Sequence, residues 1–156
     1  MERENGGRTN LQRRALAGIV PYERHIGFYL DLGGGLSRAP TLRDSVRVAG
    51  DVDADRVLHY LEHAPVLAVT LQLVDDVLAG EGEGSFIEPL VIHTDGTWDW
   101  RSDIAYYYCK YHVRLRDEFL WHIRYRLWTP PTPTEIGLPE WCASETAGEV
   151  RNFIHQ

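Results

Sequence analysis

The sequence predicts a single α+β domain with a small antiparallel or mixed sheet packed by helices, and three observations support this prediction. The chain has 156 residues, of which 44% are hydrophobic and 25% charged, as is typical of one folded globular domain. Segments with helical spacing of apolar residues are mixed with short runs typical of strands. Residues 89–128 combine a hairpin pattern with two helical patterns, and we expect them to form the core.

Residues 1–20 are predicted to form a mobile N-terminal arm, because they are polar, contain glycine and are rich in arginine. The α+β domain is expected to cover residues 21–128. Its first element is a strand from His25 to Leu32, in which apolar residues alternate with polar or small ones. The Gly33 to Gly35 run that follows lacks the spacing of a phosphate-binding loop, so we interpret it as a flexible connection.

The next element is predicted to be a helix that Asp51 or Asp53 caps and that Pro65 ends. Its two histidines, His59 and His63, are four residues apart and share one helix face. Because the motif His-Glu-x-x-His is absent, we interpret them as surface residues and not as metal ligands. The apolar stripe of this helix is formed by Val57, Leu58 and Leu61.

Residues 66–85 are predicted in three parts. Residues 66–71 fit a buried strand or the start of a helix, and the apolar pattern does not decide between them. Residues 72–78 favour a helix, because their apolar residues are spaced to share one face while Asp75 and Asp76 lie outside it. Residues 79–85 alternate glycine with glutamate, which predicts a loop.

A β-hairpin is predicted at the start of the 89–128 segment. Residues 90–93 fit one strand, Asp95-Gly96 is typical of a type I′ turn, and residues 97–100 fit the return strand. Trp98 and Trp100 are two residues apart, so they share one face of that strand. We expect this face to pack against the helices that follow.

Two helices are predicted after the hairpin. The first has Ser102 as its N-cap and ends at Tyr111. The second opens with Asp117 and Glu118 and is stopped by Pro130. Their apolar stripes are Ile104, Tyr107, Tyr108 and Tyr111 in the first helix, and Phe119, Leu120, Ile123 and Leu127 in the second.

Residues 129–156 are predicted to form a proline-led C-terminal extension. Its first residues, 130–133, include three prolines and are typical of an extended, polyproline-like connector. Trp141 is expected to anchor the extension, because one aromatic side chain can bury roughly 150–250 Å². Residues 146–155 fit either a final short helix or a contact with a partner or a second copy, so homodimer formation stays open.

Charge is distributed unevenly along the chain. The net charge is −7 and the sequence pI is about 5.4, which argues against general nucleic-acid binding. Residues 51–95 hold ten acids against Arg56 alone, a balance of −9, whereas residues 1–24 and 101–126 carry +2 and +3. An acidic region of this kind can steer and select a basic partner, and it also suits a solvated surface.

Several functional classes are not expected. No apolar run approaches the roughly 18–20 residues that span a bilayer, and the first residues lack the apolar core of a signal peptide. We therefore expect a soluble, cytoplasmic protein with no membrane partner.

Cys109 and Cys142 fit neither a disulfide framework nor a zinc site, and the acids lack the spacing of a calcium loop. Neither a metal nor another cofactor is expected.

A resemblance covers part of the hairpin and helix region. Thr94-Asp95-Gly96-Thr97-Trp98-Asp99-Trp100, followed by Ala105-Tyr106-Tyr107, Tyr111-His112-Val113 and Asp117-Glu118-Phe119, resembles a segment of small uncharacterised actinobacterial proteins. Some proteins of that kind look like immunity partners of secreted or contact-dependent toxins. The resemblance is confined to residues 94–119 and implies an immunity-type binding role, with no catalytic residue attached to it.

The leading hypothesis is a non-catalytic protein-binding domain, of immunity or inhibitor type, whose acidic face occludes a basic partner. Asp75, Asp76 and Glu88 are the expected charged contacts. Trp98 and Trp100 are the expected aromatic anchors at the centre of the interface.

The alternative hypothesis is a small biosynthetic or hydrolytic enzyme. His93, Asp99 and His112, together with a tyrosine, are its candidate acid–base groups. Ordinary structural roles also explain these residues, since Asp99 fits a solvent-facing strand position and His112 fits a packing position between two helices. The binding hypothesis is therefore preferred.

Overall fold

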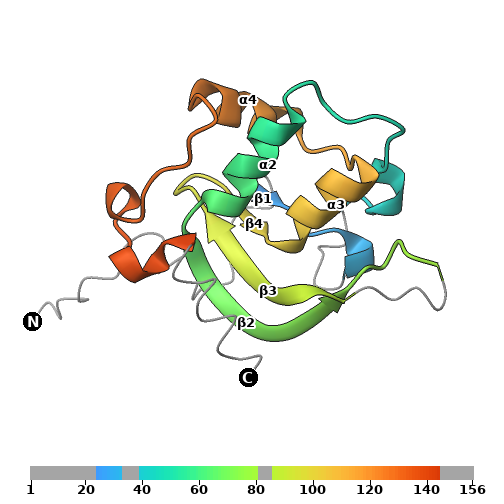
Figure 1. The fold of residues 1–156 in the computed structure, drawn as a ribbon, viewed down its shortest axis with the longest axis horizontal. Coiled ribbons are helices and arrows are strands. Elements are labelled where there is room, and N and C mark those ends of the chain that lie inside the picture. The colour runs from blue at the N-terminus through green and yellow to red at the C-terminus, as the bar shows by residue number, and fades with distance from the viewer. Residues whose placement is uncertain (1–23, 33–38, 81–85, 145–156) are drawn as a thin grey trace, which may run out of the picture.

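The structure is a computed structural model that describes residues 24–32, 39–80 and 86–144 (Figure 1). The predicted N-terminal arm of residues 1–20, the Gly33 to Gly35 connection and the helix considered for residues 146–155 lie outside the described residues.

The described strands form one four-stranded sheet in the order β1-β4-β3-β2. β3 pairs antiparallel with both β2 and β4, whereas β1 pairs parallel with β4. The sheet is therefore mixed, and the predicted α+β class is confirmed. The strands are β1 (His25–Ile26), β2 (Val66–Asp75), β3 (Phe86–Thr94) and β4 (Asp99–Arg101).

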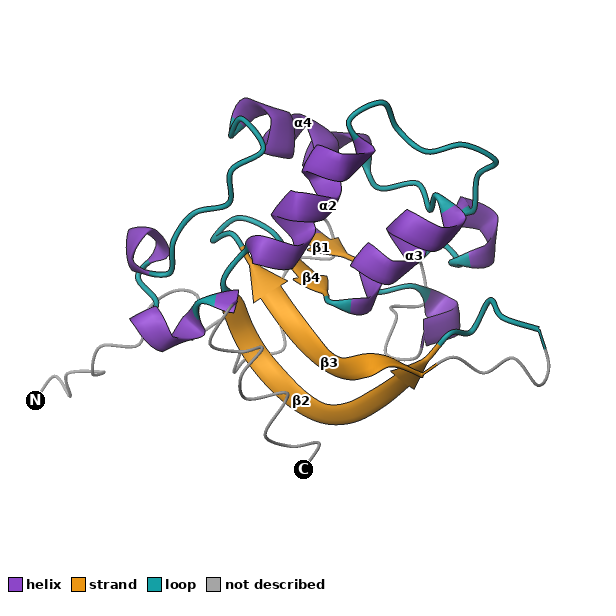
Figure 2. Ribbon diagram, in the orientation of Figure 1, coloured by secondary structure: helices purple, strands orange, loops and turns teal. Residues whose placement is uncertain are grey.

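The described α-helices lie together on one side of the curved β2–β3 pair (Figures 1 and 2). This arrangement lets each helix bury its apolar stripe against the sheet or a neighbouring helix. The helices are α2 (Ala54–His63), α3 (Asp103–Tyr111) and α4 (Asp117–Tyr125).

The core lies between the sheet and the helices and is built largely from aromatic side chains. Trp100 in β4 is fully buried, and its ring centroid lies 5.9 Å from that of Tyr60 and 5.4 Å from that of Phe119. Trp98 packs on the same Phe119 ring at 5.3 Å, so the prediction that both tryptophans face the helices is confirmed. The indole Nε1 of Trp100 donates to the Leu61 carbonyl at 3.0 Å, which satisfies a buried donor.

The starts of α2 and α3 are as predicted, but the two expected capping side chains make other contacts. α2 begins directly after Asp53, whose carboxylate accepts a hydrogen bond from Nε of Arg124 at 3.2 Å. α3 begins directly after Ser102, whose hydroxyl accepts from the backbone N–H of Val91 at 3.0 Å. Each side chain therefore joins its helix to another element.

The first strand is shorter than predicted. β1 ends at Ile26, and Leu30–Leu32 forms a short 3-10 helix instead of continuing the strand. Gly27 lies between them with a φ of 88°, a conformation that interrupts an extended strand and that glycine adopts without strain.

The helix predicted for residues 72–78 is wrong. β2 continues through Asp75, because its backbone finds hydrogen-bonding partners along β3, with Leu73 opposite Pro89. Spacing of apolar residues within one segment cannot report such long-range pairing. The chain turns only at Asp76, whose Oδ1 accepts hydrogen bonds from two following backbone N–H groups at 2.9 and 3.1 Å.

The type I′ turn predicted at Asp95-Gly96 is also wrong. A type I′ turn requires a positive φ at both central residues, but Gly96 has a φ of 87° and Asp95 is not among the described residues with a positive φ. The connection instead runs from Asp95 to Trp98, and Asp95 Oδ1 accepts from the backbone N–H groups of Thr97 and Trp98 at 2.9 and 2.7 Å. Asp95 thereby stabilises the turn with its side chain.

The end of the described chain departs from prediction at two residues. α4 ends at Tyr125, so Leu127, predicted on its apolar face, lies beyond the helix and is 75% exposed. Trp141, predicted as the anchor of the extension, is 70% exposed, whereas its neighbours Leu138 and Cys142 are buried. The buried side chains of this segment are therefore the two smaller ones and not the Trp141 ring.

Candidate functional site

The three acids predicted as binding contacts have different surroundings. Asp75, at the end of β2, is exposed. Asp76, the next residue, is buried, with 5% of its surface exposed. The backbone of Glu88 pairs with Val74 in the sheet, and its side chain lies outside the described residues.

Asp76 is bound by three side chains from α3. Its Oδ2 accepts hydrogen bonds from the hydroxyls of Tyr106 and Tyr111 at 2.8 and 2.6 Å, and from Nζ of Lys110 at 3.1 Å. Burial raises the pKa of this carboxyl, but these hydrogen bonds outweigh burial and lower the pKa to about 2. Asp76 is therefore a charged group of the interior that holds α3 on the sheet, and it is not free to meet a partner.

Other acids of the 51–95 region also serve internal contacts. Asp51 accepts from both terminal nitrogens of Arg47 at 3.0 and 3.1 Å and from the Tyr108 hydroxyl at 2.9 Å. Asp53 is paired with Arg124. The acidic region is consequently less negative as a surface than its sequence indicates, and its exposed acids in the described residues are Asp55, Glu62 and Asp75.

Trp98 and Trp100 cannot act as surface anchors in this conformation. Only 7% of Trp98 and none of Trp100 is exposed, and both rings pack on Phe119. Their prediction as binding residues is therefore corrected, because the same apolar surface that would attract a partner is already buried against α4.

The residues of the enzyme hypothesis do not form one site. His93 is 2% exposed, stacks on Trp100 with ring centroids 6.1 Å apart, and places Nδ1 2.9 Å from the Ala64 carbonyl. Asp99 is equally buried but accepts from the hydroxyl of Thr94, the residue after His93 in β3. Since successive strand residues point to opposite faces, His93 and Asp99 belong to opposite faces of the sheet.

His112 lies at a third place. It follows α3 with a left-handed backbone (φ 54°), and its carbonyl accepts from Nε of Arg47 at 2.9 Å. Its ring lies beside Gly50, where an added Cβ would be 3.0 Å from Nδ1. His112 therefore packs on the loop that precedes α2, whereas His93 and Asp99 make their contacts at the strands.

A different histidine–aspartate pair does form, and sequence reasoning missed its histidine. His122 in α4 places Nε2 2.8 Å from Oδ2 of Asp95, which also accepts from the Tyr60 hydroxyl at 2.7 Å. Burial raises the pKa of Asp95, but the His122 hydrogen bond and the others outweigh it, so that the pKa lies below its ordinary value. The cluster ties α2 and α4 to the β3–β4 connection, and no local pattern pairs residues that lie 27 and 35 positions apart.

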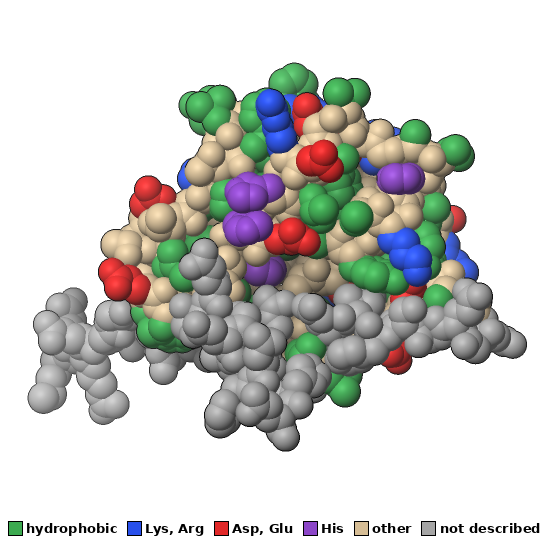
Figure 3. Space-filling model, viewed as in Figure 1, with side chains coloured by type: hydrophobic (Ala, Val, Ile, Leu, Met, Phe, Trp, Pro, Cys, Tyr) green, Lys and Arg blue, Asp and Glu red, His purple; other side chains and the backbone are tan. Residues whose placement is uncertain are grey.

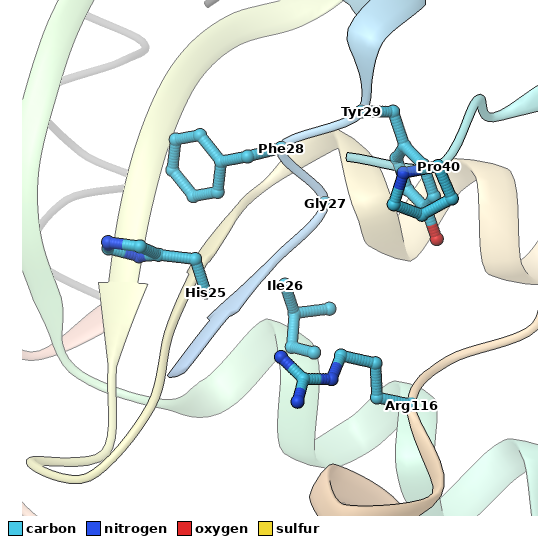
Figure 4. Close-up of a pocket in the computed structure, with 7 residues that line it drawn as sticks. All are labelled: His25, Ile26, Gly27, Phe28, Tyr29, Pro40 and Arg116. Atoms are coloured by element: carbon cyan, nitrogen blue, oxygen red, sulfur yellow. The ribbon is translucent and has the colours of Figure 1, made fainter. Parts of the chain in front are cut away.

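A small open pocket lies beside β1 (Figure 4). Figure 4 shows Arg116, from the segment before α4, extending toward Ile26 of β1. The guanidinium of Arg116 also lies over the Trp98 ring at 5.4 Å. None of the predicted site residues lines the pocket, whose lining consists of His25, Ile26, Gly27, Phe28, Tyr29, Pro40 and Arg116.

Large apolar side chains are exposed along the second half of α4 and just after its end. Trp121 is 68% exposed, Tyr125 89% and Leu127 75%. We call these three residues the α4 ridge. In Figure 3, hydrophobic side chains project along the edge of the molecule where α4 lies, while acidic side chains lie on the adjoining face over α2. Sequence reasoning missed the ridge, although Trp121 and Tyr125 are one helical turn apart on the side opposite the predicted apolar stripe.

The backbone at the end of the ridge has an uncommon conformation. Leu127 and Trp128 both have positive φ values, 54° and 55°, which cost energy for residues other than glycine. The backbone N–H of Trp128 donates to the Ile123 carbonyl at 3.0 Å, and the guanidinium of Arg56 lies 4.6 Å from the centre of its ring. These contacts pin Trp128, and Leu127 is left projecting outward.

Comparison with known proteins finds no matching family model, curated protein or solved structure. Among the described residues, no group of three or more His, Cys, Asp or Glu side chains is placed to hold a metal ion. A helix long and apolar enough to cross a membrane is also absent from the described ranges.

Proposed function

We propose that this chain is a non-catalytic protein-binding domain that contacts its partner through the α4 ridge, Trp121, Tyr125 and Leu127. The observation that carries the proposal is the exposure of these three side chains, each more than two-thirds open to solvent, two of them on α4 and the third just after it. Contiguous exposed apolar side chains typically mark interaction surfaces.

The composition of the ridge suits a binding surface. Tryptophan and tyrosine are enriched among the residues that dominate binding energy, because one rigid ring buries a large area while its polar group still finds a partner. Trp121 and Tyr125 are exposed on a helix whose opposite side is fixed by the buried Phe119 and Ile123. A partner would therefore meet side chains on a rigid support.

Preorganisation of the neighbouring backbone supports the same surface. The Arg124–Asp53 ion pair at 3.2 Å joins α4 to the start of α2, and the Arg56–Trp128 contact joins α2 to the residue that follows the ridge. Holding Leu127 in a strained conformation before binding lowers the ordering cost of the complex.

Charge favours a basic partner. The chain has a net charge of −7, and Asp55 and Glu62 are exposed on α2, which packs against α4. Acids beside an aromatic centre speed encounter with a positively charged protein and disfavour acidic ones. Such binding would act by occlusion, as an inhibitor or immunity protein does, with the ridge at the centre and the acids at the rim.

Affinity capture with matched variants tests this proposal. The full chain, Trp121→Ala/Tyr125→Ala and Trp141→Ala are immobilised in parallel, and any protein retained is purified and measured by calorimetry. We expect the ridge variant to lose about 2 kcal/mol or more of binding free energy, roughly 30-fold in affinity. Trp141→Ala, which removes an equally exposed tryptophan elsewhere, should bind as the native chain does.

The rim is tested on the same purified partner. Asp55→Asn/Glu62→Gln should lower the association rate at low salt and have little effect at high salt, because exposed charges are screened. A purified partner that binds the native chain and the ridge variant with equal affinity would contradict the proposal.

A further inference from the structure

The solvent face of α2 carries two adjacent imidazoles. His59 and His63 are both exposed, and their rings stack with centroids 4.1 Å apart and planes inclined by 25°. Figure 3 shows histidine side chains gathered on the face that α2 covers. Because the two residues are one helical turn apart, both imidazoles project from the same face of α2. The rings stack face to face, so a rotation of one exposed side chain brings a nitrogen of each ring to a shared ion.

The ring of His63 has a defined orientation. Its Nδ1 lies 2.8 Å from the carbonyl oxygen of His59. A carbonyl oxygen can only accept a hydrogen bond, so Nδ1 carries the proton and, in the neutral ring, Nε2 holds the free lone pair. The same Nδ1–H to carbonyl contact orients histidines that bind metals through Nε2.

We propose that His59 and His63 together bind one divalent transition-metal ion, such as Zn²⁺, Cu²⁺ or Ni²⁺, through their ring nitrogens. Imidazole is a preferred ligand of these metals, whereas Mg²⁺ and Ca²⁺ prefer oxygen. Two protein ligands leave the other coordination positions of the ion to water or to a group brought by another molecule.

Nearby charge favours a cation at this place. Asp55 lies one turn before His59 on the same side of α2, and Glu62 precedes His63; both carboxylates are exposed. They raise the local concentration of cations without serving as ligands in the proposed site. The ridge on α4 supplies no ligand, and metal binding is measured without a protein partner, so the result is independent of the proposed protein-binding function.

Metal titration of the tag-free full chain tests the site. Zn²⁺, Cu²⁺, Ni²⁺ and Mg²⁺ are titrated separately by calorimetry into the native chain, His59→Gln, His63→Gln, the double variant and Glu62→Gln. Glu62→Gln is the matched control, because it changes an exposed side chain on the same helix and leaves both imidazoles in place. The Cu²⁺ complex is also examined by electron paramagnetic resonance, which detects nitrogen ligands directly.

We expect one transition-metal ion per chain at the α2 site, no comparable binding of Mg²⁺, and a nitrogen signature in the Cu²⁺ spectrum. Each single histidine variant should bind about tenfold more weakly or worse, since two linked ligands act as a chelate, and Glu62→Gln should stay within a few-fold of native, since it keeps both ligands. Both histidine positions are exposed, so the variants should fold. Unchanged affinity in the double variant, or native binding of Mg²⁺ as tight as of Zn²⁺, would overturn the proposal.

Discussion

Asp76 and Asp95 are both acids that directly follow a strand, and each first stabilises the turn that it begins. The Asp76 carboxylate forms hydrogen bonds with three side chains from α3. The Asp95 carboxylate forms them with Tyr60 from α2 and His122 from α4. Each carboxylate therefore joins the sheet to helices from distant parts of the chain. A buried carboxylate is stable only with such partners, because desolvation of an unpaired charge is costly.

Asp76 should make the stability of the protein depend on pH. Its folded pKa of about 2 lies below the ordinary value of 3.8, so the stability it contributes is fully present above about pH 4 and is lost as the pH falls toward about 2. The lowered pKa of Asp76 corresponds to about 2 kcal/mol of unfolding free energy. In urea unfolding at successive pH values, the stability difference between the native chain and Asp76→Asn should narrow across this range.

Asp75→Asn is the matched control for this measurement, because Asp75 is the adjacent acid in the chain and its side chain is exposed. Removing this exposed charge should change the free energy of unfolding by less than about 0.5 kcal/mol. A difference between native and Asp76→Asn that stays constant from neutral to acidic pH would contradict the assignment.

At the scale of elements, long-range pairing overrides local pattern in β2. Residues 72–78 have helical spacing of apolar side chains, yet the backbone as far as Asp75 extends β2 against β3. By contrast, α3 has the predicted bounds. Its aromatic side chains recur at helical spacing, and in the structure they pack in or against the core from one face of the helix. The spacing of apolar residues therefore predicts an element correctly only when the packing of that element in the fold requires the same spacing.

The β3–β4 connection gives a prediction at this scale. Gly96 has a φ of 87°, and a Cβ added there would lie 3.0 Å from Cγ2 of Ile136. Gly96→Ala should therefore lower the free energy of unfolding by about 1–3 kcal/mol, through backbone strain and crowding together. Gly80→Ala, where nothing lies within 4 Å of the added Cβ, should change stability by less than about 0.5 kcal/mol in the same denaturation experiment. Equal effects of the two substitutions would contradict this account of the turn.

For the whole molecule, tertiary structure separates residues that look equivalent in sequence. The acidic region divides into acids that pair internally, such as Asp51 and Asp53, and acids that remain exposed, such as Asp55 and Glu62. The tryptophans divide in the same way, with Trp100 inside the core and Trp121 on the surface. Only the second group in each case is accessible to a partner among the described residues.

Conservative tryptophan substitutions test this division. Trp100→Phe should cost about 1–3 kcal/mol of unfolding free energy, because it removes the hydrogen bond to Leu61 and changes the shape of a packed core. Trp121→Phe should stay within about 0.5 kcal/mol of native, since its ring is exposed. Urea unfolding followed by far-ultraviolet circular dichroism measures both without relying on the altered residue. A comparable loss at both positions would show that Trp121 also supports the fold.

The candidate site was less predictable than the fold. Asp95 was visible as a turn residue, but neither Tyr60 nor His122 carries a local signal that it will meet this carboxylate. Trp98 and Trp100 were expected both as core and as binding residues, and burial leaves them the first role. The α4 ridge follows from the helical position of Trp121 and Tyr125, yet its exposure depends on what packs around α4.

By itself the sequence determined the α+β class, the positions of α2 and α3, the start of α4 and the aromatic face of the hairpin, because periodicity and turn residues act over a few neighbouring positions. Tertiary structure alone decided the length of β2, the internal pairing of Asp51, Asp53, Asp76 and Asp95, and the exposure of the ridge. These features depend on contacts between residues far apart in the chain. Net charge was a property of the sequence, but the fold determined which charges face solvent.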